Sequence, residues 1–209
     1  MTLISAHFDQ LYFANCNLEK PLIYNSKIII PTRQLGLLPD HPLNPNQEMI
    51  FLSKAYLIFD GVKKSVRQLT GYIESPPDSR HFKPLEENSR IVVDDDFPDF
   101  NGNVNLFGLE GVFDEPLEWV DWEIESASFY LMEHPADNWD FTELWTDVTA
   151  FPLKVLILVI QAEGISFIYD PSRNYQLVFF SFTYEDASLW LQKNQYKPVE
   201  QRFKKEIYI

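Results

Sequence analysis

A row of carboxylates is the feature of this sequence with the clearest chemical potential. In the segment Leu117–Met132, Asp121, Glu123 and Glu125 occupy alternate positions, and Trp119 precedes them at the same spacing. Alternating polar and apolar residues are typical of a strand with one face on the core and one in water. At a rise of about 3.4 Å per residue, neighbouring carboxylates would lie about 7 Å apart along the strand. The core face is expected to hold the apolar even-numbered residues Val120, Trp122, Ile124, Tyr130 and Met132.

The acidic residues are concentrated in one part of the chain. The formal net charge is −14, from 17 basic and 31 acidic residues. The segment 91–153 contains sixteen acidic residues and four of the five tryptophans, but no lysine or arginine. An acidic surface repels phosphate and attracts basic proteins, so the sequence argues against direct nucleic-acid binding and against an anionic membrane. The alternative is that these acidic residues serve only solubility.

No motif for catalysis or phosphate binding occurs in the sequence. The G-x-S-x-G, Walker A, H-E-x-x-H and G-x-G-x-x-G patterns are absent. The four histidines are scattered without metal-ligand spacing, and the single cysteine, Cys16, has no adjacent basic residue that would activate its thiol. We therefore expect no catalytic residue and no cofactor.

One pattern partly matches a calcium-binding loop. Oxygen-bearing side chains occupy its positions 1, 3, 5, 7 and 12, namely Asp99, Asn101, Asn103, Asn105 and Glu110. The glycine that makes the sharp turn at position 6 is replaced by Val104. We therefore expect no bound metal.

The hydrophobic pattern predicts an α+β fold, predominantly antiparallel β, with two short helices in the C-terminal third. The Asp60-Gly61 pair supplies the positive φ of a tight turn and predicts a hairpin between strands at 49–59 and 62–73. The helices are expected at 140–148 and 183–194, each opening with capping-box spacing. Further strands are expected at 21–30, 104–113 and 117–132, followed by an antiparallel meander at 155–160, 165–169 and 175–182.

Turn-forming residues between Pro135 and Asn138 mark a candidate domain boundary. They predict a β-rich domain over residues 1–134 and a smaller α+β subdomain over residues 135–209, packed against the first. A single α+β domain over residues 1–209 is the alternative.

The compartment follows from what the chain lacks. A single cysteine excludes an intrachain disulfide, and the first residues include no basic leader. The longest apolar run, 155–160, is far shorter than the about 20 residues of a membrane helix. We expect a cytoplasmic protein without membrane association.

These observations favour a non-enzymatic, acidic binding protein that docks on a basic protein partner. The expected contact residues are Trp119, as an apolar anchor, with Asp121, Glu123 and Glu125. A bacterial toxin is one concrete partner, since carboxylates could block the phosphate-binding cleft of a nuclease, as in a toxin-neutralising (immunity-type) protein. Two alternatives stay open: a carboxylate-based, metal-dependent enzyme using acids of the 94–125 region, and a structural or assembly subunit.

Overall fold

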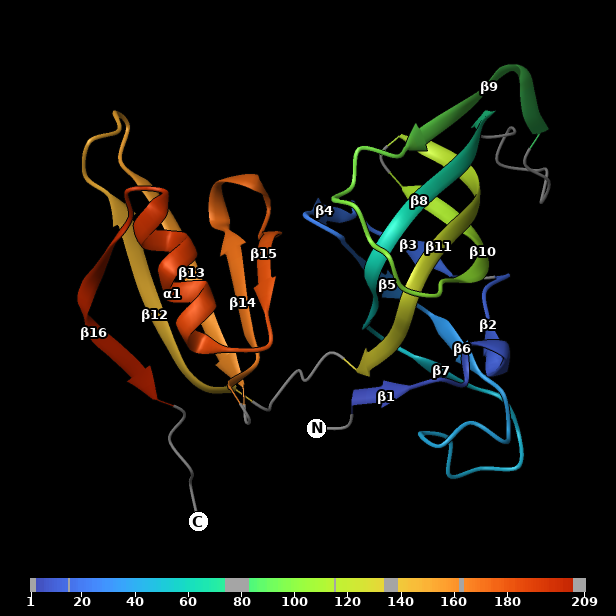
Figure 1. Ribbon diagram of the computed structural model, residues 1–209, viewed down its shortest axis with the longest axis horizontal. Coiled ribbons are helices and arrows are strands. Elements are labelled where there is room, and N and C mark those ends of the chain that lie inside the picture. The colour runs from blue at the N-terminus through green and yellow to red at the C-terminus, as the bar shows by residue number, and fades with distance from the viewer. Residues whose placement is uncertain are drawn as a thin grey trace. The chain divides into compact units, whose positions relative to one another are not determined.

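The chain is mostly β-structure (Figure 1). A computed structural model describes residues 3–14, 16–73, 83–114, 116–133, 139–161 and 164–204. The chain divides into two compact units, Thr2–His134 and Pro135–Ile209. Each unit has its own sheet structure and is described by itself.

The first unit is built around a closed ring of strands. The sheet order is β1-β11-β10-β3-β5-β8-β9, and β8 also pairs with β11, so β8, β11, β10, β3 and β5 form a barrel. All these pairs are antiparallel except β3 with β10. Strand β4 lies beside β5, and β2, β6 and β7 form a small separate sheet. The strands are β1 (Leu3–Ser5), β2 (Leu11–Tyr12), β3 (Asn17–Leu18), β4 (Leu22–Tyr24), β5 (Lys27–Arg33), β6 (Leu35–Leu37), β7 (Ile50–Leu52), β8 (Ala55–Ile73), β9 (Lys83–Asp94), β10 (Asn105–Asp114) and β11 (Leu117–Glu133).

Leucine, aromatic and β-branched side chains fill this unit. Phe8, on the 3-10 helix η1 (Phe8–Gln10), makes edge-to-face contacts with Phe59, Phe107 and Phe129. Such contacts add to the stabilisation from burial of apolar area. The core therefore joins residues that are far apart in the sequence but adjacent around the ring.

The predicted hairpin at Asp60-Gly61 is wrong, because β8 runs without a break from Ala55 to Ile73. Gly61 does have a positive φ of 66°, but it lies next to a β-bulge: Glu125 pairs with Lys64, while Ser126 pairs with Val62. Long-range pairing with β5 on one side and β11 on the other overrides the local turn preference. The dipeptide bends a long strand instead of reversing the chain.

The side of β11 that faces the core changes at Ala127, next to Gly61 of β8. Before it, Val120, Trp122 and Ile124 are core residues, as predicted. After it, the main core contains Phe129 and Leu131 instead of their even-numbered neighbours. The change falls between Ser126 and Phe129, where the facing strand holds the positive-φ residue Gly61, and the sequence pattern alone did not reveal it.

The second unit is an antiparallel sheet with a helix on one face (Figure 1). Its order is β15-β14-β13-β12-β16, and α1 contacts β14 and β15. The predicted meander and the helix at 183–194 are confirmed, and the side chain of Thr183 accepts a hydrogen bond from the backbone of Asp186. The elements are β12 (Trp139–Asp147), β13 (Lys154–Gln161), β14 (Ser166–Asp170), the 3-10 helix η3 (Pro171–Arg173), β15 (Gln176–Ser181), α1 (Tyr184–Lys193) and β16 (Lys197–Lys204).

The other predicted helix, at 140–148, is wrong, so the described residues contain one α-helix instead of two. This segment forms β12, which pairs with β13 on one side and β16 on the other. Its aromatic and β-branched residues, including Phe141 and Trp145, suit a sheet better than a helix. The capping-box spacing of Asp140 and Glu143 was coincidental, because Glu143 is buried in the sheet.

Candidate functional site

Four carboxylates gather on the outer face of the barrel. Asp121 and Glu123 are exposed on β11, Glu125 follows them on the same face, and the strand register places Glu110 of β10 directly opposite Asp121. Within the part of the chain that the structure describes, no hydrogen bond or ion pair engages Glu110, Glu123 or Glu125. Like charges directly opposite each other are destabilising. We call Glu110, Asp121, Glu123 and Glu125 the acidic face.

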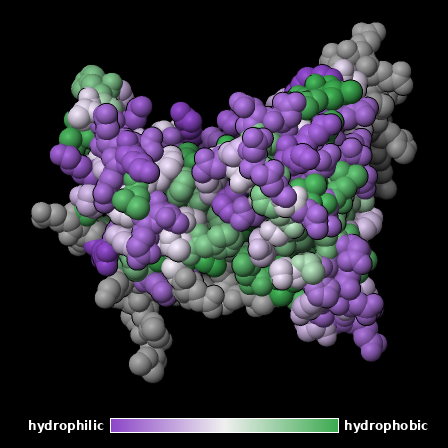
Figure 2. Space-filling view, in the orientation of Figure 1, coloured by the Kyte–Doolittle hydropathy of each residue, from purple (hydrophilic) through white to green (hydrophobic). Residues whose placement is uncertain are grey.

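Exposed apolar residues border the acidic face. Ile91 and Val93 of β9 are 69% and 49% exposed, and Leu106 of β10 is 64% exposed. The register places Val93 opposite Val66 of β8, which is itself opposite Glu123. Hydrophobic surface lies beside hydrophilic surface over the part of the unit where β9 and β10 lie (Figure 2). We call Ile91, Val93 and Leu106 the apolar flank.

A hydrogen-bonded network on the opposite side of the strands fixes β11 against β8 and β9. The indole nitrogen of Trp122 donates to Ser65 Oγ at 2.9 Å, and the guanidinium of Arg67 lies 5.0 Å from the Trp122 ring centroid. Arg67 in turn donates to Asp94 of β9 at 2.6 Å. A bidentate pair between Arg90 of β9 and the buried Glu118 of β11 adds a second link. Strands held in this way present the acidic face and its flank as a rigid surface.

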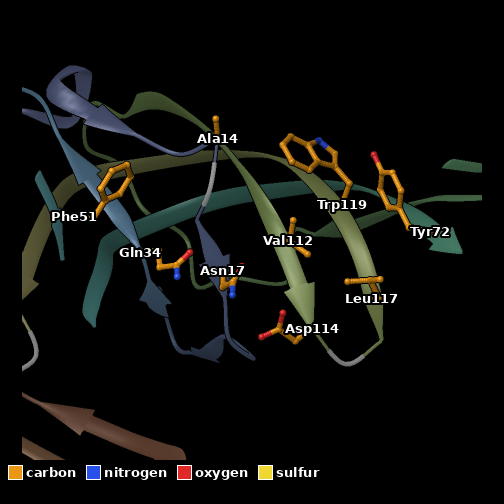
Figure 3. A pocket seen from close by; sticks show the side chains of 9 residues that line it. All are labelled: Ala14, Asn17, Gln34, Phe51, Tyr72, Val112, Asp114, Leu117 and Trp119. Carbon is orange, nitrogen blue, oxygen red and sulfur yellow. The ribbon is translucent and has the colours of Figure 1, made fainter. Parts of the chain in front are cut away.

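At one end of the same outer face lies a groove with a volume of about 820 Å³ (Figure 3). Three aromatic side chains from three strands line it: Phe51 of β7, Tyr72 of β8 and Trp119 of β11. The other described lining residues are Ala14, Asn17, Gln34, Val112, Asp114 and Leu117, so none of the nine is basic. We call this site the aromatic groove. Its size lies within the range of about 300–1,000 Å³ that is usual for small-ligand sites.

Trp119 connects the aromatic groove to the acidic face. Its ring lines the groove, while its indole nitrogen donates to Asp121 Oδ1 at 3.2 Å. On the groove wall, Asp114 accepts from Arg33 at 2.7 Å, and the Arg33 guanidinium also contacts Glu19 at 3.3 Å. Two carboxylates therefore share one cation, so the groove rim has an excess of negative charge.

The structure places all four sequence-predicted residues, Trp119, Asp121, Glu123 and Glu125, along β11 in the predicted alternation. Their role in binding stays a prediction. The sequence did not predict the other residues of the acidic face, the apolar flank and the aromatic groove, because strand register and barrel closure bring them together. No local signal marked Phe51, Tyr72, Ile91, Val93 and Leu106, and Glu110 was singled out only as part of the calcium-loop pattern.

The second unit has its own buried carboxylate. Glu143 of β12 accepts hydrogen bonds from Trp145 Nε1 at 3.0 Å, from Tyr184 OH at 3.3 Å and from Arg202 Nε at 2.6 Å. The Arg202 guanidinium also lies 4.7 Å from the ring centroid of Phe141. These partners occupy the oxygens of Glu143, which indicates a structural link between β12, β16 and α1.

Metal ligation has no support in the described ranges, where no group of three or more His, Cys, Asp or Glu residues could hold a metal ion. The last positions of the calcium-loop pattern, Asn105 and Glu110, lie on strand β10 and not in a loop.

No helix among the described residues is long and apolar enough to cross a membrane.

The thiol of Cys16 is expected to be unreactive in the folded protein. Burial raises its pKa to about 12, against a smaller opposing effect of a hydrogen bond with Thr32. Since the thiolate is the nucleophile, alkylation by iodoacetamide at neutral pH should be at least about 100-fold slower in native buffer than in denaturant. Mass spectrometry of the alkylated fraction over time measures this ratio. Rapid labelling of the native protein would show that Cys16 is accessible and ionised.

Comparison with known proteins found no matching family model, no matching curated protein and no matching solved structure.

Proposed function

We propose that the protein is a non-enzymatic binding protein that docks on a basic protein partner. The contact surface is the acidic face with its apolar flank, and Trp119 serves as an anchor at one end. The observation that carries the proposal is the pairing of Asp121 with Glu110, for which the described residues supply no counter-charge, beside three exposed apolar side chains. A basic toxin is one partner of this chemistry, because carboxylates can occupy a cleft that otherwise binds phosphate.

Charge and apolar area have separate roles in this proposal. Clustered carboxylates speed encounter with a basic surface and fix its orientation. Exposed Ile91, Val93 and Leu106 supply area whose burial stabilises the complex, at about 25 cal/mol per Å² before the costs of association. Binding would also relieve the repulsion between Asp121 and Glu110. These features support docking better than catalysis, because the described carboxylates of this surface do not converge with a nucleophile or a metal cluster.

The proposal is tested by selecting short random peptides on the immobilised protein. The selected peptides are expected to be basic with apolar residues, and their affinity should fall as salt rises above about 0.15 M. Combining Asp121→Lys, Glu123→Lys and Glu125→Lys should weaken their binding about 100-fold, if each reversal costs roughly 1 kcal/mol. Isothermal titration calorimetry gives the affinities, and circular dichroism verifies the fold.

A triple variant with the same change in net charge is the matched control. Asp9, Asp40 and Glu48 are exposed acidic residues of the same unit outside the acidic face. Changing these three to lysine should weaken peptide binding by no more than about threefold, because distant exposed charges are screened. Equal losses in both triple variants, or selection of peptides without basic residues, would refute docking through the acidic face.

A further inference from the structure

The aromatic groove has the chemistry of a site for a planar cation. Trp119 and Tyr72 lie on neighbouring strands: Trp119 pairs with Thr70, so Tyr72 is two residues further along β8 on the same face. Side chains in this diagonal relation are within reach of each other when they are aromatic. Figure 3 shows both rings at one end of the groove and Phe51 at the other. Aromatic faces attract guanidinium and ammonium groups.

The charges around the groove favour a cation over a neutral ligand. Asp121 accepts the indole hydrogen of Trp119, which increases the electron density of the ring that faces a ligand. Asp114 on the wall is half-exposed and shares Arg33 with Glu19. No described lining residue is basic, and the Arg33 guanidinium that reaches Asp114 is outnumbered by the two carboxylates that it contacts, Asp114 and Glu19.

Two arginines among the described residues already make this interaction within the chain. Arg67 lies 5.0 Å from the ring centroid of Trp122, and Arg202 lies 4.7 Å from that of Phe141. In each case the guanidinium also donates to a carboxylate, Asp94 or Glu143. The groove offers the same combination of aromatic ring and carboxylate, but the described residues supply no guanidinium over Trp119.

We propose that the aromatic groove binds an arginine side chain of the partner protein, stacked on Trp119, with the carboxylates Asp114 and Asp121 on either side of that ring along the strands. This inference rests on the proposed function, since the arginine belongs to the basic partner that docks on the acidic face. A neutral oligosaccharide could also stack on exposed aromatic rings, but it would not use the negative charge of the rim. The groove thus selects for charge as well as for a flat shape.

The test uses the whole chain and a peptide with one arginine, acetyl-Gly-Arg-Gly-amide. Titration should shift the indole N–H resonance of Trp119, assigned with a Trp119→Phe variant, and the shift should saturate. The same peptide with citrulline, a neutral isostere of arginine, should bind about tenfold more weakly. Trp119→Ala and Trp119→Leu should each weaken arginine-peptide binding about fivefold or more, because both remove the aromatic face. In these variants the backbone resonances of Val112 and Gln34 report the binding.

Phe203→Ala is the control for removing an aromatic ring, because Phe203 is 45% exposed and lies outside the groove. This variant should bind the arginine peptide as the unchanged protein does. Since leucine keeps apolar bulk at position 119, Trp119→Leu keeps the test valid even if Trp119→Ala fails to fold. Equal binding of the citrulline peptide, or a neutral maltopentaose that shifts the same resonances more strongly, would overturn the proposal.

The two proposals fail separately. If basic peptides are selected and lose affinity with the acidic-face reversals, but the arginine peptide leaves the Trp119 resonance unmoved, the groove inference is wrong and docking stands. If the arginine peptide shifts Trp119 but no basic peptide is selected, the groove binds a cation without the proposed partner-docking face.

Discussion

Replacing Glu143 by alanine is expected to lower the free energy of unfolding of the second unit by about 3 kcal/mol. The Glu143 side chain is 5% exposed and accepts from the indole of Trp145, which is itself buried. Removal of the carboxylate leaves that donor without an acceptor and leaves Arg202 without its counter-charge. The Arg202 side chain is 53% exposed, so water can solvate its charge once the carboxylate is gone. The expected destabilisation is therefore at the lower end of the range of about 3–5 kcal/mol for a broken buried ion pair.

Urea denaturation followed by tryptophan fluorescence measures this effect, and Asp140→Ala is the control. Asp140 is an exposed carboxylate on the same strand, so its removal should change stability by less than about 0.5 kcal/mol. Glu143→Gln keeps an oxygen for Trp145 and should fall between the two. If Glu143→Ala is no more destabilising than Asp140→Ala, the hydrogen-bonded cluster does not stabilise the unit.

Replacing Gly61 by valine is expected to destabilise the first unit by about 3 kcal/mol, through two separate costs. Gly61 has a φ of 66°, where a β-branched residue is strained. A Cβ at this position would also lie 2.8 Å from the Cβ of Ala127 on β11, which is too close for two carbon atoms. The neighbouring strand would have to move, and the β8–β11 pairing would weaken.

Gly108→Val is the control for Gly61→Val, because Gly108 also lies in a strand of the same unit but has no heavy atom within 4 Å of an added Cβ. Valine there should leave the denaturation midpoint unchanged or raise it slightly, since β-branched residues favour strands. Equal midpoints for the Gly61 and Gly108 variants would contradict the bulge geometry.

Sequence-based prediction succeeded where the structure depends on local interactions and failed where it depends on contacts between distant strands. Alternation in Leu117–Met132 predicted β11 and the placement of Asp121, Glu123 and Glu125, because period-two patterning depends on one strand alone. Thr183 predicted the start of α1 because a cap is a local hydrogen bond. The predictions at Asp60-Gly61 and at 140–148 failed where neighbours on both sides override a local signal.

The candidate site shows the same limit. The residues of one strand could be assigned to one face from the sequence. Glu110 joins them through the β10–β11 register, and Ile91 and Val93 join through β8. The aromatic groove requires Phe51 and Trp119, from separate strands of a folded unit, and no spacing rule relates them.

The barrel closes at a narrow seam, and this has a consequence for its breathing motions. Within the described residues, strand β3 has two residues and pairs with β10 at Val112 and Phe113 alone. Local opening is easiest where few backbone hydrogen bonds must break, so the ring should open first at this seam. Asn17 and Val112 lie on opposite sides of the seam and both line the aromatic groove. An occupant that contacts both would bind the closed ring in preference to the open one, and by mass action it would hold the barrel shut.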